Sequence, residues 1–336
     1  MIVPELASSF AGRRVLITGG LGFLGSSLAH ELVEGGANVV LVDSLVPEYG
    51  GNRENIRGIE DSVQVNVSDV RDEHSLRRLV EGQEFLFNLA GQTSHLDSMT
   101  DPFTDLEINS RAQLSILEAC RHHNPEVSIV FASTRQIYGS PSYLPVDERH
   151  PIAPVDVNGI NKTAGEWYHL LYGRVYGMRV AALRMTNTYG PRMRVRDARQ
   201  TFLGWWFRLI LEGKELTIYG DGLQRRDFNY VDDAVRAFLL AAVRDEAVGQ
   251  VYNLGSSEVV ALRDLAGLLV EVNGTGSLEL IPFPDDRKAI DIGDYYADFS
   301  KIERDLGWRP AIDLRDGLMR SLEYYRAHRA HYWDEA

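Results

Sequence analysis

The sequence predicts an α/β fold in which helices cover both faces of a parallel sheet. Three observations lead to this prediction. Short aliphatic runs alternate with helical segments through the first half of the chain, a glycine-rich turn joins the first run to the first helix, and an acidic residue ends the second run. Strands that are apolar along nearly their whole length are typical of a sheet buried on both faces, and their connections are right-handed crossovers.

The positions of the strands and helices follow from the spacing of apolar residues. Continuous apolar runs predict strands, and apolar residues at helical spacing between those runs predict helices. The expected strands cover residues 14–17, 39–42, 63–65, 85–87 and 128–131. The expected helices between them cover residues 26–34, 73–80 and 106–122.

The glycine-rich turn has the form and the position of a dinucleotide-binding motif. Gly19, Gly22 and Gly25 follow the first expected strand with the spacing GxxGxxG and lead into the first helix. The first glycine permits a tight turn, the second lets the backbone approach a pyrophosphate, and the third lets helix and strand pack closely. Asp43, after the second strand, is placed to bind a ribose 2′-hydroxyl and to repel a 2′-phosphate. The fold class is therefore a Rossmann-type doubly wound sheet, with NAD rather than NADP as the expected cofactor.

The regular alternation of strands and helices ends near residue 190. An arginine-rich stretch, a glycine-rich turn and shorter mixed elements follow. We therefore expect residues 1–185 to form mainly the NAD-binding domain. Residues 186–336 should form mainly a smaller C-terminal lobe that binds substrate, with some segments returning to the first domain.

The composition excludes several classes of protein. The chain of 336 residues carries 35 Lys and Arg against 48 Asp and Glu, a formal net charge of −13 that disfavours nucleic-acid binding. No apolar run reaches the ~18 residues of a membrane span, and the N-terminus lacks the pattern of a signal peptide. The single cysteine, Cys120, cannot form an intrachain disulfide and fits a reducing compartment. We therefore expect a cytoplasmic protein that binds neither nucleic acid nor membranes and has no metal site.

Sequence motifs recur along the whole chain in a characteristic order. After the glycine turn come Asn-Leu-Ala-Gly at 88–91, Ala-Ser-Thr at 132–134, Asn-Thr-Tyr-Gly-Pro-Arg at 187–192 and Gly-Asp-Gly-Leu-Gln-Arg-Arg-Asp-Phe at 220–228. Asn109, Ile-Tyr-Gly at 137–139, Tyr-Asn-Leu-Gly at 252–255, Ala-Asp at 297–298 and Leu-Gly-Trp at 306–308 complete the set. Together these motifs resemble the extended short-chain dehydrogenases that act on nucleotide-sugars, the epimerase/dehydratase family. The segment 220–228 is specific to the sugar-nucleotide branch.

The resemblance implies roles for residues beside the cofactor and the sugar. Thr134 would hydrogen-bond the sugar hydroxyl that is oxidised. Lys162 would hold the nicotinamide ribose and lower the pKa of a neighbouring acid/base group. Asp69, after the third strand, fits two roles equally well, because it could accept from the adenine amino group or belong to the cap of the next helix.

The resemblance also implies a diphosphate site in the second half of the chain. Asn187 and Arg226 would contact the diphosphate, with Arg287 or Lys288 helping, and the planar fork of arginine suits diphosphate oxygens. For Arg226 the alternative role is a surface salt bridge with Asp227. The expected cofactor contacts are Gly19, Gly22, Phe23, Leu24, Gly25, Asp43, Asp69, Val70, Leu89, Ala90 and Lys162. The expected substrate contacts are Gln92, Thr134, Asn187, Arg226, Arg287 and Lys288.

One position departs from the family pattern and concerns catalysis directly. Family members that oxidise a sugar carry Tyr-x-x-x-Lys, in which the lysine and the nicotinamide stabilise the phenolate. Here the lysine is Lys162, and Asn158 takes the place of the tyrosine. An amide has no acid/base chemistry near neutral pH, whereas a positioned acid/base group contributes a factor of ~10² to 10⁴ in rate.

Three interpretations of this departure remain open. In the first, Tyr138, His95 or Asp97 takes over the proton; the last two lie in the loop after the fourth strand, which should overhang the substrate. The alternative role for His95 is a hydrogen bond within the loop. In the second, water or Lys162 assists the step. In the third, the protein has lost catalysis and only binds NAD and a nucleotide-sugar.

The motifs also rank the reactions known in the family. Dehydratases that remove the 6-hydroxyl carry Asp-Glu after the threonine, and decarboxylating members keep the glutamate, but here those positions are Arg135 and Gln136. Residues 43–52 look like those of UDP-glucose 4-epimerases, whereas residues 90–92 and 133–139 look like those of CDP-sugar 2-epimerases. We expect an epimerase-like enzyme of the UDP-sugar 4-epimerase type. A CDP-sugar 2-epimerase-like enzyme and an inactive binding protein are the alternatives.

The resemblance further suggests a homodimer. The helices expected at residues 106–122 and 160–176 would pair with their copies in a four-helix bundle. Their apolar residues could equally face the core of their own chain.

Overall fold

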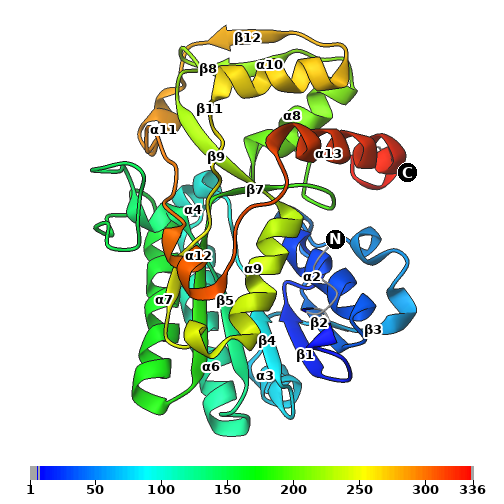
Figure 1. Cartoon of the computed structure of the whole chain (residues 1–336), viewed down its shortest axis with the longest axis vertical. Helices are drawn as coiled ribbons and strands as arrows, with labels where there is room; N and C mark the ends of the chain where they lie inside the picture. The colour runs from blue at the N-terminus through cyan, green and yellow to red at the C-terminus, as the bar shows by residue number, and fades with distance from the viewer. Residues whose placement is uncertain (1–5, 7, 334–336) are drawn as a thin grey trace.

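A seven-stranded sheet forms the centre of the molecule in the computed structural model, which describes residue 6 and residues 8–333 (Figure 1). Its strands are β1 (Arg14–Thr18), β2 (Asn38–Asp43), β3 (Val63–Val67), β4 (Phe85–Asn88), β5 (Ser128–Thr134), β6 (Arg179–Met185) and β10 (Val251–Asn253). They lie in the order β10-β6-β5-β4-β1-β2-β3, and every neighbouring pair is parallel. The predicted α/β fold with a doubly wound parallel sheet is confirmed.

Helices cover both faces of this sheet because successive strand residues point to opposite sides. The helices on one face are α2 (Phe23–Glu34) and α9 (Val231–Val243), and those on the other are α3 (Glu73–Val80), α6 (Ala112–His123) and α7 (Val157–Tyr176). In β1, Val15 and Ile17 pack into the core on the α2 side, whereas Leu16 packs into the core on the α6 side. Burial on both faces explains the continuous apolar runs in the sequence.

Two helical segments differ from the sequence-based prediction. The first helix begins at Phe23 rather than at residue 26, so its N-terminus lies directly beside the glycine turn. The helix expected over residues 106–122 is divided: α5 (Pro102–Leu106) is followed by a π-helical turn (Glu107–Arg111) and then by α6. A short helix, α4 (His95–Thr100), precedes them. The π-helical turn carries Asn109, which makes it relevant to the site, because such turns recur at functional positions.

The second half of the chain forms two small sheets and also returns to the main sheet. The three-stranded sheet contains β7 (Asn187–Tyr189), β9 (Arg225–Tyr230) and β11 (Val259–Ala261), and the two-stranded sheet contains β8 (Leu216–Tyr219) and β12 (Leu278–Ile281). Besides α9, the helices of this half are α8 (Phe202–Leu211), α10 (Leu262–Asn273), α11 (Asp285–Lys288), α12 (Ser300–Leu306) and α13 (Leu314–His328). One apolar cluster continues from β1 and α2 into α8, α10 and α13, so the C-terminal lobe, at the top of Figure 1, packs firmly on the first half.

Two features of the described residues bear on the kind of protein. None of the helices in residues 8–333 is long and apolar enough to cross a lipid bilayer. The same part of the chain contains no group of three or more His, Cys, Asp and Glu side chains that could hold a metal ion. Residues 1–5, which belong to the segment expected to lack a signal peptide, lie outside the described residues.

Candidate active site

A cavity of about 530 Å³ lies at the carboxyl ends of the parallel strands and extends to the C-terminal lobe. It includes the place where the strand order reverses, between β1 and β4, which is where open α/β sheets bind their ligands. The expected cofactor residues Gly19, Gly22, Phe23, Leu24, Gly25, Asp43, Asp69, Val70, Leu89, Ala90 and Lys162 all line it. His95, Thr134, Asn158, Asn187, Arg226 and Arg287 line it as well.

Tyr138, one of the three candidate bases, is not among the residues that line this cavity, so the structure does not support it in that role. The side chain is fully buried, and its hydroxyl donates to Asn253 Oδ1 at 2.7 Å and accepts from Arg184 Nη1 at 2.6 Å. Burial raises the pKa of this phenol to about 12. Asp97, another candidate base, is also not among the residues that line the cavity.

Two expected substrate contacts also lie away from the cavity. Gln92 is buried in the loop behind the wall, where its side-chain amide donates to Ser94 O at 3.0 Å. Lys288 is exposed at the end of α11, whereas Arg287 lines the cavity. Adjacent residues of a helix point in different directions, so the structure favours Arg287 over Lys288 and corrects the expectations for Lys288 and Gln92.

Two positions of the glycine turn accept only glycine, because any side chain there would strain the backbone or collide with it. Gly19 has a φ of +67°, a conformation that favours glycine, and a Cβ at Gly25 would lie 2.2 Å from Gly19 O. No side chain caps the first turn of α2 at Gly22. The N-terminus of α2 therefore offers its backbone N–H groups and the positive end of its dipole to a phosphate.

Asp43 ends β2 at the opposite wall of the cofactor region. Its carboxylate accepts from Leu21 N at 3.0 Å and from Leu45 N at 2.9 Å. Burial raises the pKa of Asp43, although these two backbone hydrogen bonds lower it in part. The backbone thus fixes the carboxylate at the cavity wall, and each oxygen keeps a lone pair for a ribose hydroxyl.

Replacing Asp43 by asparagine should narrow the preference for NAD over NADP. The wild-type protein should bind NAD at least about tenfold more tightly, because a carboxylate repels a 2′-phosphate. Calorimetric titration of both cofactors measures the ratio, with Asp61→Asn as a control at an exposed position. Equal affinities of the wild-type protein for both cofactors would contradict the assignment of Asp43.

The structure excludes one of the two roles that the sequence left open for Asp69. Asp72, not Asp69, caps α3 by accepting from His74 N and Ser75 N. Asp69 lines the cavity and forms an ion pair with Arg71 at 2.6 Å, a contact that helps to hold its pKa below the usual value. The capping role therefore belongs to Asp72, and a contact of Asp69 with adenine stays a prediction.

Lys162 lies at the floor of the cavity, where the nicotinamide half of a dinucleotide would bind. Its Nζ donates to Ala132 O at 3.2 Å, and burial lowers the pKa of the amine to about 8. A Cβ at Gly91 would lie 2.8 Å from this Nζ and 3.0 Å from Asn109 Oδ1, which is a buried acceptor without a hydrogen-bond partner. An ammonium and a free acceptor thus face the space that Gly91 leaves, and these residues fit the hydroxyls of an NAD ribose.

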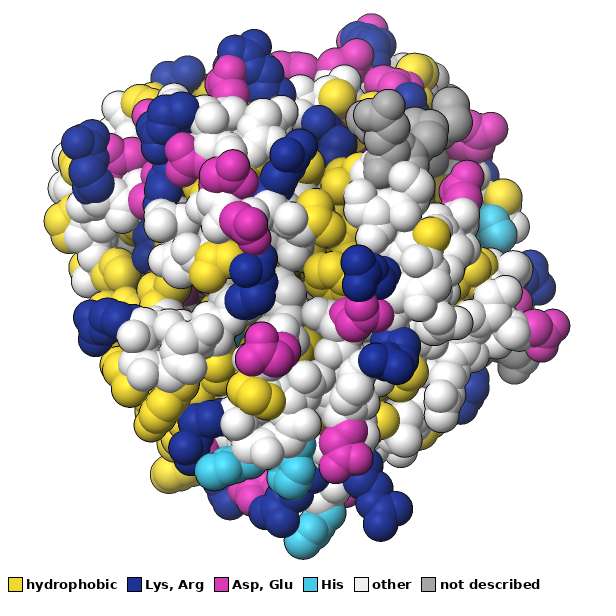
Figure 2. Space-filling view, turned by 60° about the horizontal axis from the view of Figure 1, so that its bottom comes forward, with side chains coloured by type: hydrophobic (Ala, Val, Ile, Leu, Met, Phe, Trp, Pro, Cys, Tyr) yellow, Lys and Arg dark blue, Asp and Glu magenta, His cyan; other side chains and the backbone are white. Residues whose placement is uncertain are grey.

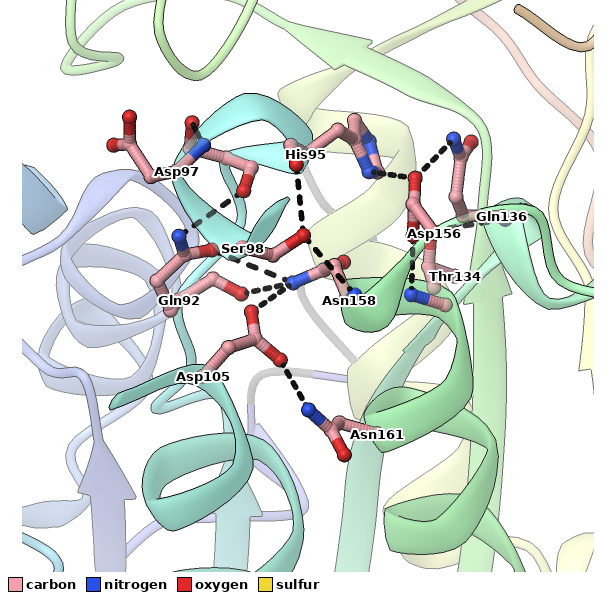
Figure 3. Close-up of polar contacts among 12 residues, drawn as sticks. Gln92, His95, Asp97, Ser98, Asp105, Thr134, Gln136, Asp156, Asn158 and Asn161 are labelled. Carbon is pink, nitrogen blue, oxygen red and sulfur yellow. Dashed lines mark hydrogen bonds and ion pairs between the residues drawn. The ribbon is translucent and has the colours of Figure 1, made fainter. Parts of the chain in front are cut away.

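Asn158 is held by the loop that follows β4 (Figure 3). Its side-chain amide donates to Gln92 O at 2.8 Å and to Asp105 Oδ2 at 2.9 Å. Asn161, one helical turn further along α7, donates to Asp105 Oδ1 at 2.8 Å. Asp105 is fully buried. Both N–H groups of the Asn158 amide donate to these two acceptors, so the side chain acts as a structural hydrogen-bond donor.

His95 lines the cavity on the other side of the first turn of α7. Its Nδ1 lies 2.9 Å from Asp156 Oδ2, a close contact in which the N–H direction departs from that of an ideal hydrogen bond. Asp156 caps α7 by accepting from Gly159 N and also accepts from Gln136 Nε2 at 3.1 Å. Burial alone would raise the pKa of Asp156, but the contacts with His95, Gly159 and Gln136 outweigh burial and lower it.

The substrate end of the cavity is rich in arginine. Arg226 is buried, and its guanidinium donates to the backbone oxygens of Gly293 and Arg225. Its nearest carboxylate is that of Asp291 at 3.9 Å, so the alternative of a salt bridge with Asp227 does not hold. Burial, and then the charge of Arg135, lower the pKa of Arg226 to about 10, which leaves it charged at neutral pH.

Sequence reasoning missed three residues at this site. Arg135 lines the cavity and donates to Asn187 Oδ1 at 3.1 Å, but its Nη1 has no partner. Asp105 and Asp156 are buried next to the cavity, where Asp105 binds Asn158 and Asp156 contacts His95. Of these, only Asp156 had a signal in the sequence, because an aspartate before a helix predicts an N-cap. The contact with His95 joins residues 61 positions apart, which no local pattern reveals.

Comparison with known proteins gives one consistent result. Residues 15–255 match the model of a family described as the NAD dependent epimerase/dehydratase family. A putative UDP-glucose 4-epimerase of Methanocaldococcus jannaschii is 32% identical over 314 residues, which are 93% of this chain and 98% of that protein.

Two solved structures show the same likeness in three dimensions. The UDP-glucose 4-epimerase of Thermotoga maritima, solved with UDP-glucose, has a TM-score of 0.86 at 31% identity and covers 94% of this chain and 99% of its own. The dTDP-glucose 4,6-dehydratase DesIV of Streptomyces venezuelae, solved with NAD, has a TM-score of 0.87 at 28% identity. The match covers 96% of this chain and 99% of DesIV. The likeness to an epimerase and to a dehydratase is about equal, so overall similarity does not select the reaction.

Proposed function

The chain belongs to the NAD-dependent epimerase/dehydratase family, and on that premise we propose that it is a nucleotide-sugar epimerase of the UDP-sugar 4-epimerase type. NAD is its cofactor. The observation that carries the proposal is a single cavity that joins three groups of residues. The glycine turn and Asp43 would hold the dinucleotide, Thr134 and Lys162 lie between the two halves, and Arg226 and Arg287 lie at the far end.

Each group of residues has a definite task in such a reaction. NAD, when bound, supplies the acceptor for a hydride from a sugar carbon and later the donor that returns it. Thr134 would hydrogen-bond the hydroxyl on that carbon, and the Lys162 ammonium would hold the nicotinamide ribose. Arg226 would hold the diphosphate, so that the oxidised sugar can turn without leaving the protein.

Epimerisation is favoured over dehydration by the residues that follow Thr134. Removal of a 6-hydroxyl requires a group that protonates the leaving oxygen. In this chain the next two residues are Arg135, whose guanidinium binds the Asn187 side chain, and Gln136, whose amide donates to Asp156. Neither is an acid near neutral pH. A UDP-sugar is favoured because the two epimerases reported above act on UDP-glucose by name.

Replacing Arg226 by alanine should weaken the binding of UDP about tenfold or more and leave the binding of NAD unchanged. A charge-assisted hydrogen bond contributes about 1.5 to 3 kcal/mol. Because the guanidinium also holds Gly293 O, Arg226→Lys serves as a second variant that keeps the charge. Arg225→Ala is the control on the same strand, at an exposed position. Calorimetry with UDP, CDP, GDP and TDP tests this, and unchanged affinities for all four would contradict the placement of the diphosphate.

One observation favours a second candidate function, a protein that binds NAD and a nucleotide-sugar without turnover. Asn158 stands where the family carries its phenol, and its amide is engaged with Gln92 and Asp105. Incubation with UDP-glucose, UDP-galactose and their N-acetylated forms, followed by chromatography, separates the two functions. Epimerised product supports the enzyme, whereas tight binding of these sugars without product supports the binding protein. Conversion of CDP-sugars alone would indicate the 2-epimerase-like alternative.

A homodimer through α7 also belongs to this proposal. Ile160, Trp167, Leu171 and Val175 of α7 are between 40% and 58% exposed, which is unusual for large apolar side chains of one helix. Apolar side chains gather along one edge of the face in Figure 2, on the side where α7 lies in Figure 1, while charges of both signs are interspersed over the rest of that face. A second copy of α7 would cover this edge, in keeping with the expected four-helix bundle.

A further inference from the structure

The proposed reaction needs a group that exchanges a proton with the sugar hydroxyl, and the position of the family phenol does not supply one. Tyr138 is buried elsewhere, and Asp97 is not among the residues that line the cavity. Of the two loops that flank the first turn of α7, the one that follows β4 brings the imidazole of His95 to the cavity wall. Imidazole is the side chain whose ordinary pKa allows it to accept and donate a proton near neutral pH.

The surroundings of His95 hold the ring in one orientation. Its side chain is 34% exposed, and its Nδ1 lies 2.9 Å from the fully buried carboxylate of Asp156. Asp156 is itself fixed, because it accepts from Gly159 N at 2.6 Å and from Gln136 Nε2 at 3.1 Å. A carboxylate fixed at Nδ1 keeps the proton on that nitrogen and leaves Nε2 as the free acceptor.

The same contacts connect His95 to the residue expected to bind the sugar hydroxyl. Thr134 Oγ1 accepts from Gln136 N at 3.2 Å, and the side chain of Gln136 donates to Asp156. Thr134, Gln136, Asp156 and His95 thus form one continuous chain of contacts (Figure 3), and all of them except the buried Asp156 line the cavity. Asn158 lies beside this chain but is bound to the loop by its own hydrogen bonds.

We propose that His95, oriented by Asp156, exchanges the proton of the sugar hydroxyl in place of the family phenol. The inference rests on the proposed epimerase function. In the forward step His95 Nε2 would take the hydroxyl proton while the C–H hydride of the same carbon goes to the acceptor that bound NAD⁺ would supply, which would leave a ketone, the reduced cofactor and an imidazolium. In the return step the ketone carbon regains the hydride on its other face, and the imidazolium gives its proton to the oxygen. No further reactant is needed. Asp156 is a positioning residue, because it touches only the ring and its neighbours.

A purely structural role for His95 is the competing explanation, since Asp156 also caps α7. His95→Asn separates the two roles, because the asparagine amide can still donate to Asp156 but offers no acid/base group. It should retain the wild-type content of NAD and the calorimetric affinity for UDP, while conversion of UDP-glucose falls at least about 10²-fold. His123→Asn, at a histidine on the end of α6, is the matched control and should convert UDP-glucose at the wild-type rate.

A second pair of variants adds readouts that a structural role would not change. Added imidazole should restore part of the activity of His95→Ala. In Asp156→Asn the rise of the rate with pH should shift to lower pH, because the carboxylate that favours the imidazolium is lost. The other charged groups on the elements around the ring are Asp97 on α4, Asp105 on α5, Arg135 after β5, and Lys162, Glu166 and Arg174 on α7, and all are unchanged in this variant.

The outcomes distinguish this assignment from the function on which it rests. Conversion by the wild-type protein that is lost in His95→Asn, with binding retained and with imidazole rescue, supports both. Conversion that survives His95→Asn within about threefold overturns the assignment of His95 alone. An unshifted pH profile in Asp156→Asn overturns the role of Asp156. No conversion of UDP-, CDP- or dTDP-sugars by the wild-type protein overturns the proposed function and this assignment with it.

Discussion

Replacing Lys162 by methionine should lower the rate of sugar oxidation at least about 10²-fold. Methionine has nearly the length of lysine but neither charge nor N–H groups, so the cavity keeps its shape. The ammonium lies against Ala132 O and the space left by Gly91, where it would hold the nicotinamide ribose. The formation of NADH after mixing the NAD-loaded protein with UDP-glucose measures the effect.

Lys301→Met is a matched control for this prediction. The Lys301 amine also donates to a backbone oxygen, that of Val251 at 2.8 Å, but it does not line the cavity. Oxidation by Lys162→Met within about threefold of the wild-type rate would show that the ammonium has no part in the reaction.

The difference in stability between the wild-type protein and Lys162→Met should depend on pH. Burial lowers the pKa of Lys162 to about 8, so the folded protein binds fewer protons than the unfolded chain between about pH 8 and the ordinary lysine pKa of ~10.4. The buried ammonium therefore lowers the stability of the wild-type fold by its full amount below about pH 8. This loss of stability disappears as the pH rises from about 8 to ~10.4. Relative to Lys162→Met, the wild-type protein should gain stability over the same interval.

Asn158→Asp should destabilise the protein by about 3 kcal/mol at neutral pH, although it changes only one atom. The Asn158 amide donates to Asp105 Oδ2 at 2.9 Å and to Gln92 O. An aspartate would place a second carboxylate against a fully buried one, so that the two negative charges would repel each other at neutral pH. Raising the pKa of a carboxyl by about two units costs about 3 kcal/mol.

A double-mutant cycle tests whether that cost comes from Asp105. Adding Asp105→Asn to Asn158→Asp restores one donor and one acceptor, so the two substitutions should compensate each other by about 1 to 3 kcal/mol. Urea denaturation measures all four proteins, with Asn38→Asp as a control at an exposed amide that donates to Gly12 O. If the two substitutions add without interaction, the Asn158–Asp105 contact does not hold the site together.

The parts of this protein that the sequence predicted correctly are those with a local cause. The strand, turn and helix around Gly19 follow one another directly, and Asp43 ends the next strand, so spacing alone placed them in one cavity. The predicted start of the first helix lies three residues late, because no side chain caps the helix at Gly22 to mark its beginning. Local patterns thus identified residues that line one continuous part of the cavity, while their contacts with NAD stay a prediction.

The substrate half depends on contacts between distant segments, and there the prediction was less successful. The sequence suggests Tyr138 as a candidate base, but the chain turns at Gly139, with a φ of +64°, and the phenol is buried against Arg184 and Asn253. Gln92 was expected at the substrate, but its backbone oxygen instead accepts from the Asn158 amide. No spacing rule joins residues 92 and 158, since the contact exists only once α7 has packed beside the loop after β4.

One measurement tests the central claim that the protein oxidises and reduces a nucleotide-sugar at the same carbon. The protein with its bound NAD is incubated with UDP-glucose that carries deuterium at C4, and the sugar is analysed by mass spectrometry and proton NMR. The account predicts UDP-galactose that keeps the deuterium at C4, because the hydride leaves to the cofactor and returns without exchange with water. A product with protium at C4, a dehydrated keto-sugar, or unchanged UDP-glucose after prolonged incubation would contradict it.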